Sequence, residues 1–325
     1  MTKSKCLLAF VLLSLGAGCT DGQAGPIRVL ENPYLHVSQG PTVMAEGLDH
    51  PAAPRRVGED VIFAEGGKGT INRLDDQRVI PLIEGFGVDD YFGYSVSVLG
   101  IEFVPEQNFW LVASAEGEGR VYIFDAEEMP SSARLGQALA FDDTTELNPF
   151  DVLLIPEQST LLASGGTSKV YLAPFDAVNP SPLRPVLEVE TGIAGLALDP
   201  ESGLVYAAVI GSGKGDGAVI RWDPAASVIE PETMAAGFNN LVDLMVMSDG
   251  LILALEFGSF DADHSGRVLI VDETGEVLPF ITGLDAPSGF YLDEAGTLMI
   301  TTFGTPGRSD GTLLSFTLDS PSVPR

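Results

Sequence analysis

A short segment recurs six times along the chain at a nearly constant interval. Each copy has a small or polar residue, a short apolar run and then an aspartate, as in "SGRVLIVD" at 265–272. The copies lie at residues 68–75, 118–125, 167–176, 216–223, 265–272 and 310–319. Successive copies are 50, 49, 49, 49 and 45 residues apart. A fixed period in this range predicts a repeat protein in which every unit is one supersecondary structure.

Each period contains further strands on both sides of the repeated segment. Before it lies an apolar strand such as "LILALEFG" (251–258), and before that a strand that ends in a turn, such as "LALDPESG" (196–203). After it comes a fourth strand, clearest in "VIPLIEGF" (79–86) and "VLPFITGL" (277–284). Four short antiparallel strands per period are typical of one β-propeller blade. The alternative, a β-solenoid of similar period, would need capping segments at both ends.

The two ends of the chain supply complementary parts of one blade. The sixth period stops at residues 320–325 without a fourth strand, and "PTVMAEGLDHP" (41–51) is similar to "PFITGLDAP" (279–287). We therefore expect an all-β fold, a six-bladed β-propeller over residues 41–325, closed by an N-terminal strand at 41–48 that completes the last blade. Such closure removes the two free sheet edges that would otherwise pair with other chains.

The first 18 residues are predicted to be a signal peptide. Lys3 and Lys5 form a basic start, and residues 6–15 form an apolar run that is too short to span a bilayer. The following "LGAGC" (15–19) resembles the lipobox of bacterial lipoproteins. That resemblance implies secretion across the inner membrane and a lipid on Cys19, which would anchor the protein in the cell envelope at the outer membrane or periplasmic face.

The N-terminal prediction also sets the chain's domain boundaries. Residues 1–18 would be removed, residues 19–40 would form a lipidated N-terminus and linker, and the propeller would follow. The alternative is plain secretion after cleavage between small residues. Only Cys6 and Cys19 occur, so loss of the signal peptide leaves no internal disulfide and no further cysteine for zinc binding or nucleophilic catalysis.

Charge argues against two classes of partner. Lysine and arginine number 17 against 46 aspartates and glutamates, which gives a formal net charge of −29. Such acidity repels nucleic acid and anionic lipid, so we expect no nucleic-acid partner and membrane contact through the lipid anchor alone.

The blade pattern "GLD-x-P…DG-x-L…G-x-V…D" resembles six-bladed propellers of the NHL-repeat type and of the gluconolactonase/strictosidine-synthase-like superfamily. The resemblance covers residues 41–325 and implies the architecture. It also implies that gluconolactonase-like members hold one divalent metal in the central tunnel with a Glu from an "EGP" motif, two Asn and an Asp. The corresponding place here reads "DHPAAP" (49–54), so no metal ligand is transferred to this chain.

Polar residues recur where second strands end and first strands begin, positions that share one face of a propeller. These candidate tunnel-mouth residues are Glu65, Glu116, Asn148, Asp151, Asn240, Asp243 and Glu256. Clustered carboxylates repel one another, so their pKa values would be raised unless a cation neutralised them. The alternative is that these are solvated or strand-capping side chains around a water-filled tunnel.

The segment "DADHSG" (261–266) matches the first half of a calcium-binding loop, with oxygen ligands at alternate positions and a glycine at the bend. It makes Asp261, Asp263 and Ser265 candidate ligands for Ca²⁺. Asp272 stands twelfth in this loop, but six intervening extended residues would span about 20 Å and place it too far away.

The sequence contains no recognisable catalytic set. It lacks a G-x-S-x-G elbow and an H-E-x-x-H motif, and its histidines are only His36, His50 and His264. The leading interpretation is therefore an envelope-anchored, non-catalytic propeller that binds a small-molecule ligand or protein partner on one face. The alternative is a metal-assisted hydrolase or lactonase that uses a divalent cation in the central tunnel.

Overall fold

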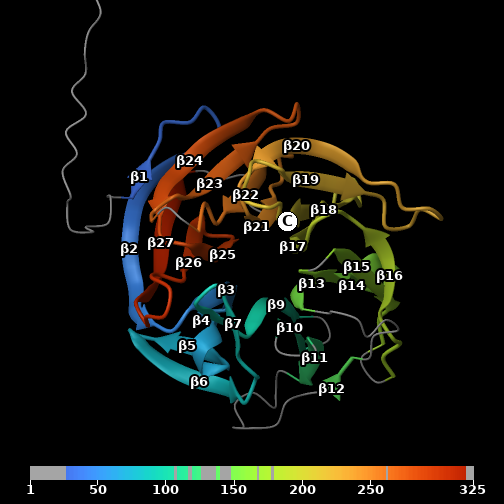
Figure 1. Ribbon diagram of the computed structural model, residues 1–325, viewed down its shortest axis with the longest axis horizontal. Coiled ribbons are helices and arrows are strands. Elements are labelled where there is room, and N and C mark those ends of the chain that lie inside the picture. Colours follow the sequence, from blue (N-terminus) through green and yellow to red (C-terminus); the bar gives the residue numbers. More distant parts are fainter. Residues whose placement is uncertain are drawn as a thin grey trace, which may run out of the picture.

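The computed structural model describes residues 27–105, 108–115, 119–125, 137–139, 148–166, 168–176, 179–260 and 263–319. These residues form six antiparallel sheets of four or five strands, arranged as blades around a central axis (Figure 1). The predicted all-β, six-bladed β-propeller is confirmed. No helix in these described ranges is long and apolar enough to cross a membrane.

Every blade repeats the same strand order from the axis outwards. The innermost strands are β3 (Pro51–Val57), β9 (Val98–Val104), β13 (Pro149–Ile155), β17 (Ile193–Leu198), β21 (Leu241–Val246) and β25 (Pro287–Leu292). The second strands are β4 (Asp60–Glu65), β10 (Phe109–Ser114), β14 (Thr160–Gly165), β18 (Val205–Val209), β22 (Ile252–Glu256) and β26 (Thr297–Thr302). The third strands are β5 (Thr70–Asp75), β11 (Arg120–Asp125), β15 (Lys169–Pro174), β19 (Gly217–Trp222), β23 (Gly266–Val271) and β27 (Gly311–Asp319). The outer strands are β6 (Arg78–Glu84), β12 (Gln137–Ala138), β16 (Arg184–Glu188), β20 (Glu232–Phe238), β24 (Val277–Leu284) and β2 (His36–Leu48).

The outer strand of the sixth blade comes from the N-terminal part of the chain. β2 pairs antiparallel with β27, from His36 opposite Asp319 to Leu48 opposite Gly311. It begins at His36 and not at residue 41 as predicted, because pairing continues through the irregular register between Gln39 and Thr42. The short β1 (Arg28–Val29) adds a fifth strand to the fifth blade beside β24.

The hydrophobic core lies between neighbouring blades. Second strands are buried on both faces, which is why β22 reads as a continuous apolar run in place of an alternating one. Leu253 and Leu255 of β22, for example, belong to the same buried cluster as Leu298 and Ile300 of β26 in the next blade. Each blade is therefore stabilised mainly by burial of apolar surface against its neighbours.

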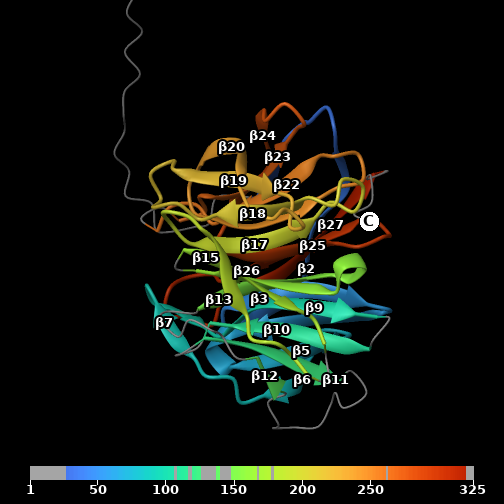
Figure 2. The same ribbon diagram turned by 90° about the vertical axis from the view of Figure 1, so that its right-hand side faces the viewer.

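One hairpin interrupts the repeat. β7 (Asp89–Tyr91) and β8 (Tyr94–Val96) pair with each other between the first and second blades, and β7 lies at one end of the propeller in the side view (Figure 2). Two short 3₁₀ turns, η1 (Gly66–Lys68) and η3 (Pro156–Gln158), connect strands within the first and third blades. The hairpin supplies Tyr91, Phe92 and Tyr94 to a cavity at one end of the tunnel.

Candidate functional site

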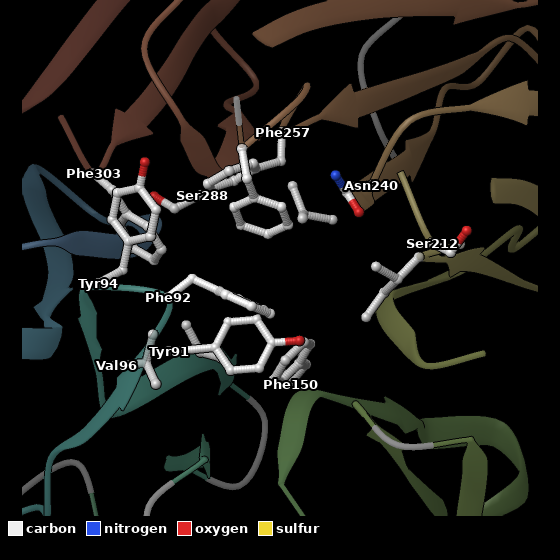
Figure 3. A pocket seen from close by; sticks show the side chains of 15 residues that line it. Tyr91, Phe92, Tyr94, Val96, Phe150, Ser212, Asn240, Phe257, Ser288 and Phe303 are labelled. Carbon is white, nitrogen blue, oxygen red and sulfur yellow. The ribbon is translucent and has the colours of Figure 1, made fainter. Parts of the chain in front are cut away.

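The central tunnel contains two cavities at opposite ends of the innermost strands. The first, of about 300 Å³, lies where these strands begin and is called the aromatic chamber (Figure 3). Its aromatic lining residues are Tyr91, Phe92, Tyr94, Phe150, Phe257, Phe260 and Phe303. The second, of about 680 Å³, lies along the later part of the same strands and is called the charged basin. Its charged lining residues are Arg55, Arg56, Glu102, Asp151, Asp243 and Glu294.

A narrow neck separates the two cavities. It holds a gap of about 10 Å³, with Leu99, Phe150 and Val242 among the residues that face the chamber side. Asp151 and Asp243 line both the gap and the basin. A space of this size holds about one water molecule, so a larger ligand in one cavity does not pass into the other.

The third residue of each innermost strand determines how closely the blades approach around the neck. Gly100, Gly195 and Gly289 occupy this position in the even-numbered blades, and a Cβ atom on Gly100 would lie 2.6 Å from Cα of Asp151. Contacts below about 3 Å do not occur between real Cβ atoms and a backbone, so only glycine fits there. Aspartates occupy the position in the third and fifth blades.

Those two aspartates connect each blade to the next. Asp151 accepts hydrogen bonds from Val152 N and, across the blade boundary, from Leu196 N, both at 2.9 Å. Asp243 does the same with Leu244 N at 2.9 Å and Phe290 N at 3.1 Å. The acceptors satisfy amides at or beside register shifts in the innermost strands, where a backbone N–H would otherwise lack a partner.

Burial raises the pKa values of both aspartates. The pKa of Asp151 is raised to about 6, and that of Asp243 to about 7, where the negative charge of Asp151 adds to the effect. The Arg55 guanidinium and the backbone N–H donors act in the opposite direction. Near neutral pH the two carboxyls therefore share a mixture of protonated and ionised forms.

Glu102 completes the acidic wall of the charged basin. Its Oε2 accepts a hydrogen bond from Leu154 N at 3.3 Å. Burial, and then the charge of Asp151, raises the pKa of Glu102 to about 8, so this carboxyl carries its proton at neutral pH. A protonated acid beside an ionised one is the arrangement that general acid–base catalysis requires.

Arg55 supplies the positive charge in this wall. Its Nη1 donates to the carbonyl of Pro54 at 2.9 Å, and its guanidinium carbon lies 5.6 Å from the centre of the Tyr291 ring. Its charge lowers the pKa values of Glu102, Asp151 and Asp243. A guanidinium has five N–H donors, and these can stabilise negative charge that develops on a bound oxygen.

The structure brings only part of the predicted tunnel-mouth set together. Glu65 and Glu256 are buried and bind basic partners. Glu65 contacts Lys68 at 2.7 Å and accepts from Asp49 N at 3.0 Å, whereas Glu256 pairs with Arg267 and accepts from Asn239 N. Both glutamates hold backbone N–H groups beside the strand ends. This agrees with the alternative that the predicted residues are strand-capping side chains.

The other predicted residues lie in different environments. Asn240 lines the aromatic chamber and donates from Nδ2 to the Gly258 carbonyl at 2.7 Å. The carbonyl of Asn148 accepts from Gly166 N at 2.9 Å. Asp151 and Asp243 lie in the charged basin, at the other end of the tunnel from Asn240. Glu116 lies outside the described residues.

The predicted calcium loop is described only in part, because Asp261 lies outside the described residues. Asp263 is exposed, and Ser265 Oγ accepts from Ser259 N at 2.8 Å, which closes the loop on itself.

The two aspartates of the charged basin do not fit a resident metal ion. In the described part of the chain, no three His, Cys, Asp or Glu side chains converge as metal ligands. The two tunnel aspartates accept backbone hydrogen bonds with both oxygens, and the neighbouring positive charge comes from Arg55. No catalytic step is therefore assigned to a metal.

Two parts of the site were missed from the sequence. Arg55 and Glu102 lie at the fifth position of their innermost strands, and their shared wall depends on the register of both blades. The chamber's signal was visible as the aromatic run "YFGY" (91–94) between two repeats.

Solved structures share this fold at low sequence identity. A gluconolactonase from Xanthomonas campestris matches with a TM-score of 0.65 at 14% identity, over 91% of this chain and 98% of that chain. A luciferin-regenerating enzyme matches with a TM-score of 0.62 at 12% identity, over 87% and 97%. A Trichoderma reesei carbohydrate-active enzyme of family AA12 matches with a TM-score of 0.60 at 11% identity, over 90% and 99%. No protein-family model matches the chain, and no curated protein matches it.

These comparisons correct the functional prediction. The leading interpretation, a non-catalytic binding propeller, is wrong, because the solved structures that share the fold are described as gluconolactonases and other enzymes. The hydrolase alternative fits them better, although no three His, Cys, Asp or Glu side chains converge to hold a tunnel metal among the described residues. The chain therefore has the fold of the gluconolactonase-like six-bladed β-propellers.

Proposed function

We propose that the protein is a hydrolase of the lactonase type, which opens a cyclic ester in the charged basin. The observation that carries this proposal is the placement of the Glu102 carboxyl and the Arg55 guanidinium in the wall of one cavity of about 680 Å³. The enzymes that share the fold, among them a gluconolactonase, support the reaction class.

Glu102 is the proton donor in this proposal. Its pKa of about 8 keeps it protonated at neutral pH. Ring opening of a lactone produces an alkoxide as the carbon–oxygen bond breaks, and an acid positioned beside that oxygen neutralises it as it leaves. A carboxyl whose pKa lies near the working pH combines a high protonated fraction with ready proton release.

Asp151 and Arg55 perform the complementary tasks. Asp151, with a pKa of about 6, is largely ionised at neutral pH and accepts a proton from the attacking water. Arg55 stabilises the negative charge on the carbonyl oxygen of the tetrahedral intermediate. The water oxygen bonds to the carbonyl carbon, the ring carbon–oxygen bond breaks, and the hydroxy acid leaves. Asp151 then holds the proton taken from water, Glu102 has given its proton to the ring oxygen, and exchange with solvent restores both groups.

We further propose that this hydrolase acts in the cell envelope. The support is the basic, apolar start of the chain and the "LGAGC" sequence that ends at Cys19. A lipid on Cys19 would hold the enzyme at a membrane surface and leave the propeller in the adjoining aqueous space.

The experiment is a lactone screen followed by matched carboxyl variants. Five- and six-membered lactones, both polyhydroxylated and aliphatic, are supplied in a weakly buffered assay that records acid release. We expect Glu102→Gln to lower kcat by about 10²–10⁴-fold, the usual contribution of a general acid. Arg55→Met should lower kcat/KM strongly, because it removes the charge while keeping a chain of similar length. Glu157→Gln changes an exposed carboxyl on η3 and serves as the control.

The pH profile separates the proposed roles. Activity should rise as Asp151 ionises around pH 6 and fall as Glu102 loses its proton around pH 8. In Glu102→Gln the falling limb should disappear from the residual activity. Hydrolysis that Glu102→Gln leaves at the wild-type rate would contradict the basin as the active site, and absence of turnover on every lactone would contradict the reaction class.

A further inference from the structure

The aromatic chamber is a second cavity that the proposed hydrolysis does not use. The neck, with room for about one water molecule, separates it from the charged basin. Its walls come from the inserted hairpin and from the second to the sixth blades, and Figure 3 shows the side chains around an open centre. A cavity of this kind, largely apolar with a few polar groups, is typical of a small-molecule site.

Rings of the hairpin and of the fifth blade form a continuous series of contacts in this chamber. Phe92 lies 4.8 Å from Tyr91 and 4.9 Å from Phe260, centre to centre. The series continues from Phe260 to Phe257 at 5.0 Å and from Phe257 to Tyr94 at 5.5 Å. The cavity is thus bordered by a series of rings from two separate parts of the chain, residues 91–94 and 257–260.

Two of these aromatic side chains are exposed to solvent, and one of them has an unfavourable backbone conformation. Phe92 is 67% exposed and Tyr91 is 51% exposed, and both rank among the exposed large hydrophobic residues of the described chain. Phe92 also adopts a φ of 54° at the hairpin turn, a conformation that is unfavourable for a bulky side chain. Folding alone gives no reason to hold a phenylalanine in this way, whereas a ligand in the chamber would cover it.

The charge beside these rings is negative. A small gap joins Tyr94, Phe257 and Phe260 to Asp263 and Asp285. Burial raises the pKa of Tyr94 to about 12, and the nearby charges of Asp285, Asp263 and Asp310 contribute to that rise. Nδ1 of His264 lies 3.9 Å from Oδ1 of Asp285. Among the described residues that line the chamber there is no lysine or arginine.

We propose that the aromatic chamber binds a small organic cation, an alkyl- or aryl-substituted ammonium. The faces of aromatic rings attract cations, and several rings around one cavity are the usual means of recognising quaternary ammonium groups. The carboxylates of Asp263 and Asp285 in the adjoining gap add long-range attraction, and the apolar walls accommodate the hydrocarbon part. An anion would be repelled by these carboxylates, and a neutral molecule would gain from the walls alone.

Binding is tested on the purified mature protein by calorimetric titration with benzyltrimethylammonium. The matched probes are neopentylbenzene, which has the same shape without the charge, and phenylmethanesulfonate, which has the opposite charge. We expect the cation to bind at least about tenfold more tightly than the neutral isostere, which corresponds to about 1.4 kcal/mol. We expect no detectable binding of the anion.

Substitutions in the aromatic chamber test whether the cation binds there. Phe92→Leu replaces an exposed ring with an aliphatic group, so it leaves the core intact and should weaken cation binding several-fold. Asp263→Asn combined with Asp285→Asn should weaken it further and reduce its dependence on salt. Asp75→Asn combined with Asp76→Asn removes the same charge from the distant turn between β5 and β6 and is the control.

The outcome is decisive in either direction. Preference for the cation that is lost in the chamber variants and kept in the control supports the proposal. Equal binding of cation and neutral isostere, binding unchanged by Phe92→Leu, or no binding of the cation overturns it. Lactone turnover is not the readout, so failure of the proposed hydrolysis would leave this result unaffected, and the reverse is also true.

Discussion

A Cβ atom placed on Gly195 would lie 2.7 Å from Oδ1 of Asp243 and 2.8 Å from its Cα on the adjacent blade. The side chain of Asp243 in turn accepts a hydrogen bond from Phe290 N of the blade beyond. A glycine in one blade thus makes room for an aspartate that holds the next blade in place. The charged basin depends on this packing, because the same aspartate lines it.

Gly195→Ala should therefore destabilise the propeller by about 1–3 kcal/mol, the usual cost of overpacking a tight interior. Denaturant unfolding of wild type and variant measures the difference. Ala197→Ser is the control. It also adds one atom to β17, but Ala197 lines the open charged basin, so this variant should change the free energy of unfolding much less. Equal stability of Gly195→Ala and wild type would show that the blades can move apart at no cost.

Stability should decrease as pH rises from about 4 to about 8. Folding raises the pKa of Glu102 to about 8 from an ordinary value of 4.5, and it raises the pKa values of Asp243 and Asp151 to about 7 and about 6. The folded state therefore holds protons that the unfolded state releases, so acid favours folding until both states are fully protonated. Unfolding free energies measured in denaturant between pH 4.5 and 8.5 provide the profile.

The Glu102→Gln variant isolates one part of that profile. Its amide does not titrate, so the loss of stability between pH 5 and pH 8 should be smaller than in wild type. Glu157→Gln, at an exposed position, should retain the wild-type slope. If Glu102→Gln and wild type lose stability equally over this range, the carboxyl does not carry a raised pKa.

The loop at residues 261–266 remains a proposed calcium site. Calcium that binds only the native state raises stability by mass action, by about 2.7 kcal/mol at a hundredfold excess over the dissociation constant. Wild-type protein should then unfold at a higher temperature in millimolar calcium than in EDTA, and Asp261→Asn with Asp263→Asn should abolish the shift. Asp75→Asn serves as the control, and an unchanged melting temperature in wild type would remove calcium from this loop.

Lipidation at Cys19 is the prediction for the N-terminus. Full-length protein expressed in a Gram-negative host with a fatty-acid probe should become labelled and fractionate with membranes, whereas Cys19→Ala should do neither. Cys6→Ala provides the matched control, because this residue lies within the predicted signal peptide and its loss should leave labelling intact. Soluble, unlabelled wild-type protein would show that Cys19 carries no lipid anchor.

The repeat predicted the architecture because a propeller blade is a local structure, and its strand order follows from the spacing of apolar runs and turns. The tunnel chemistry depends on side-chain register between blades, which spacing does not determine. Glu256 shows the difference. Its strand end was predicted, but it lies opposite Arg267 in the register of β22 and β23, and that partner removes it from the tunnel. A search for opposite charges at paired strand positions would have revealed the ion pair.

Glycine alternates with a larger residue from blade to blade around the tunnel, and this lowers the symmetry of the propeller. The six blades form three pairs, in which Gly100 packs against Asp151, Gly195 packs against Asp243, and Gly289 packs against Ala53. The third pair has an alanine in place of an aspartate, and Arg55 follows two residues later on the same strand. Two carboxyls and one guanidinium thus occupy an approximately threefold arrangement. The tunnel consequently has an electric dipole across its axis, which favours one orientation of any polar molecule that enters the basin.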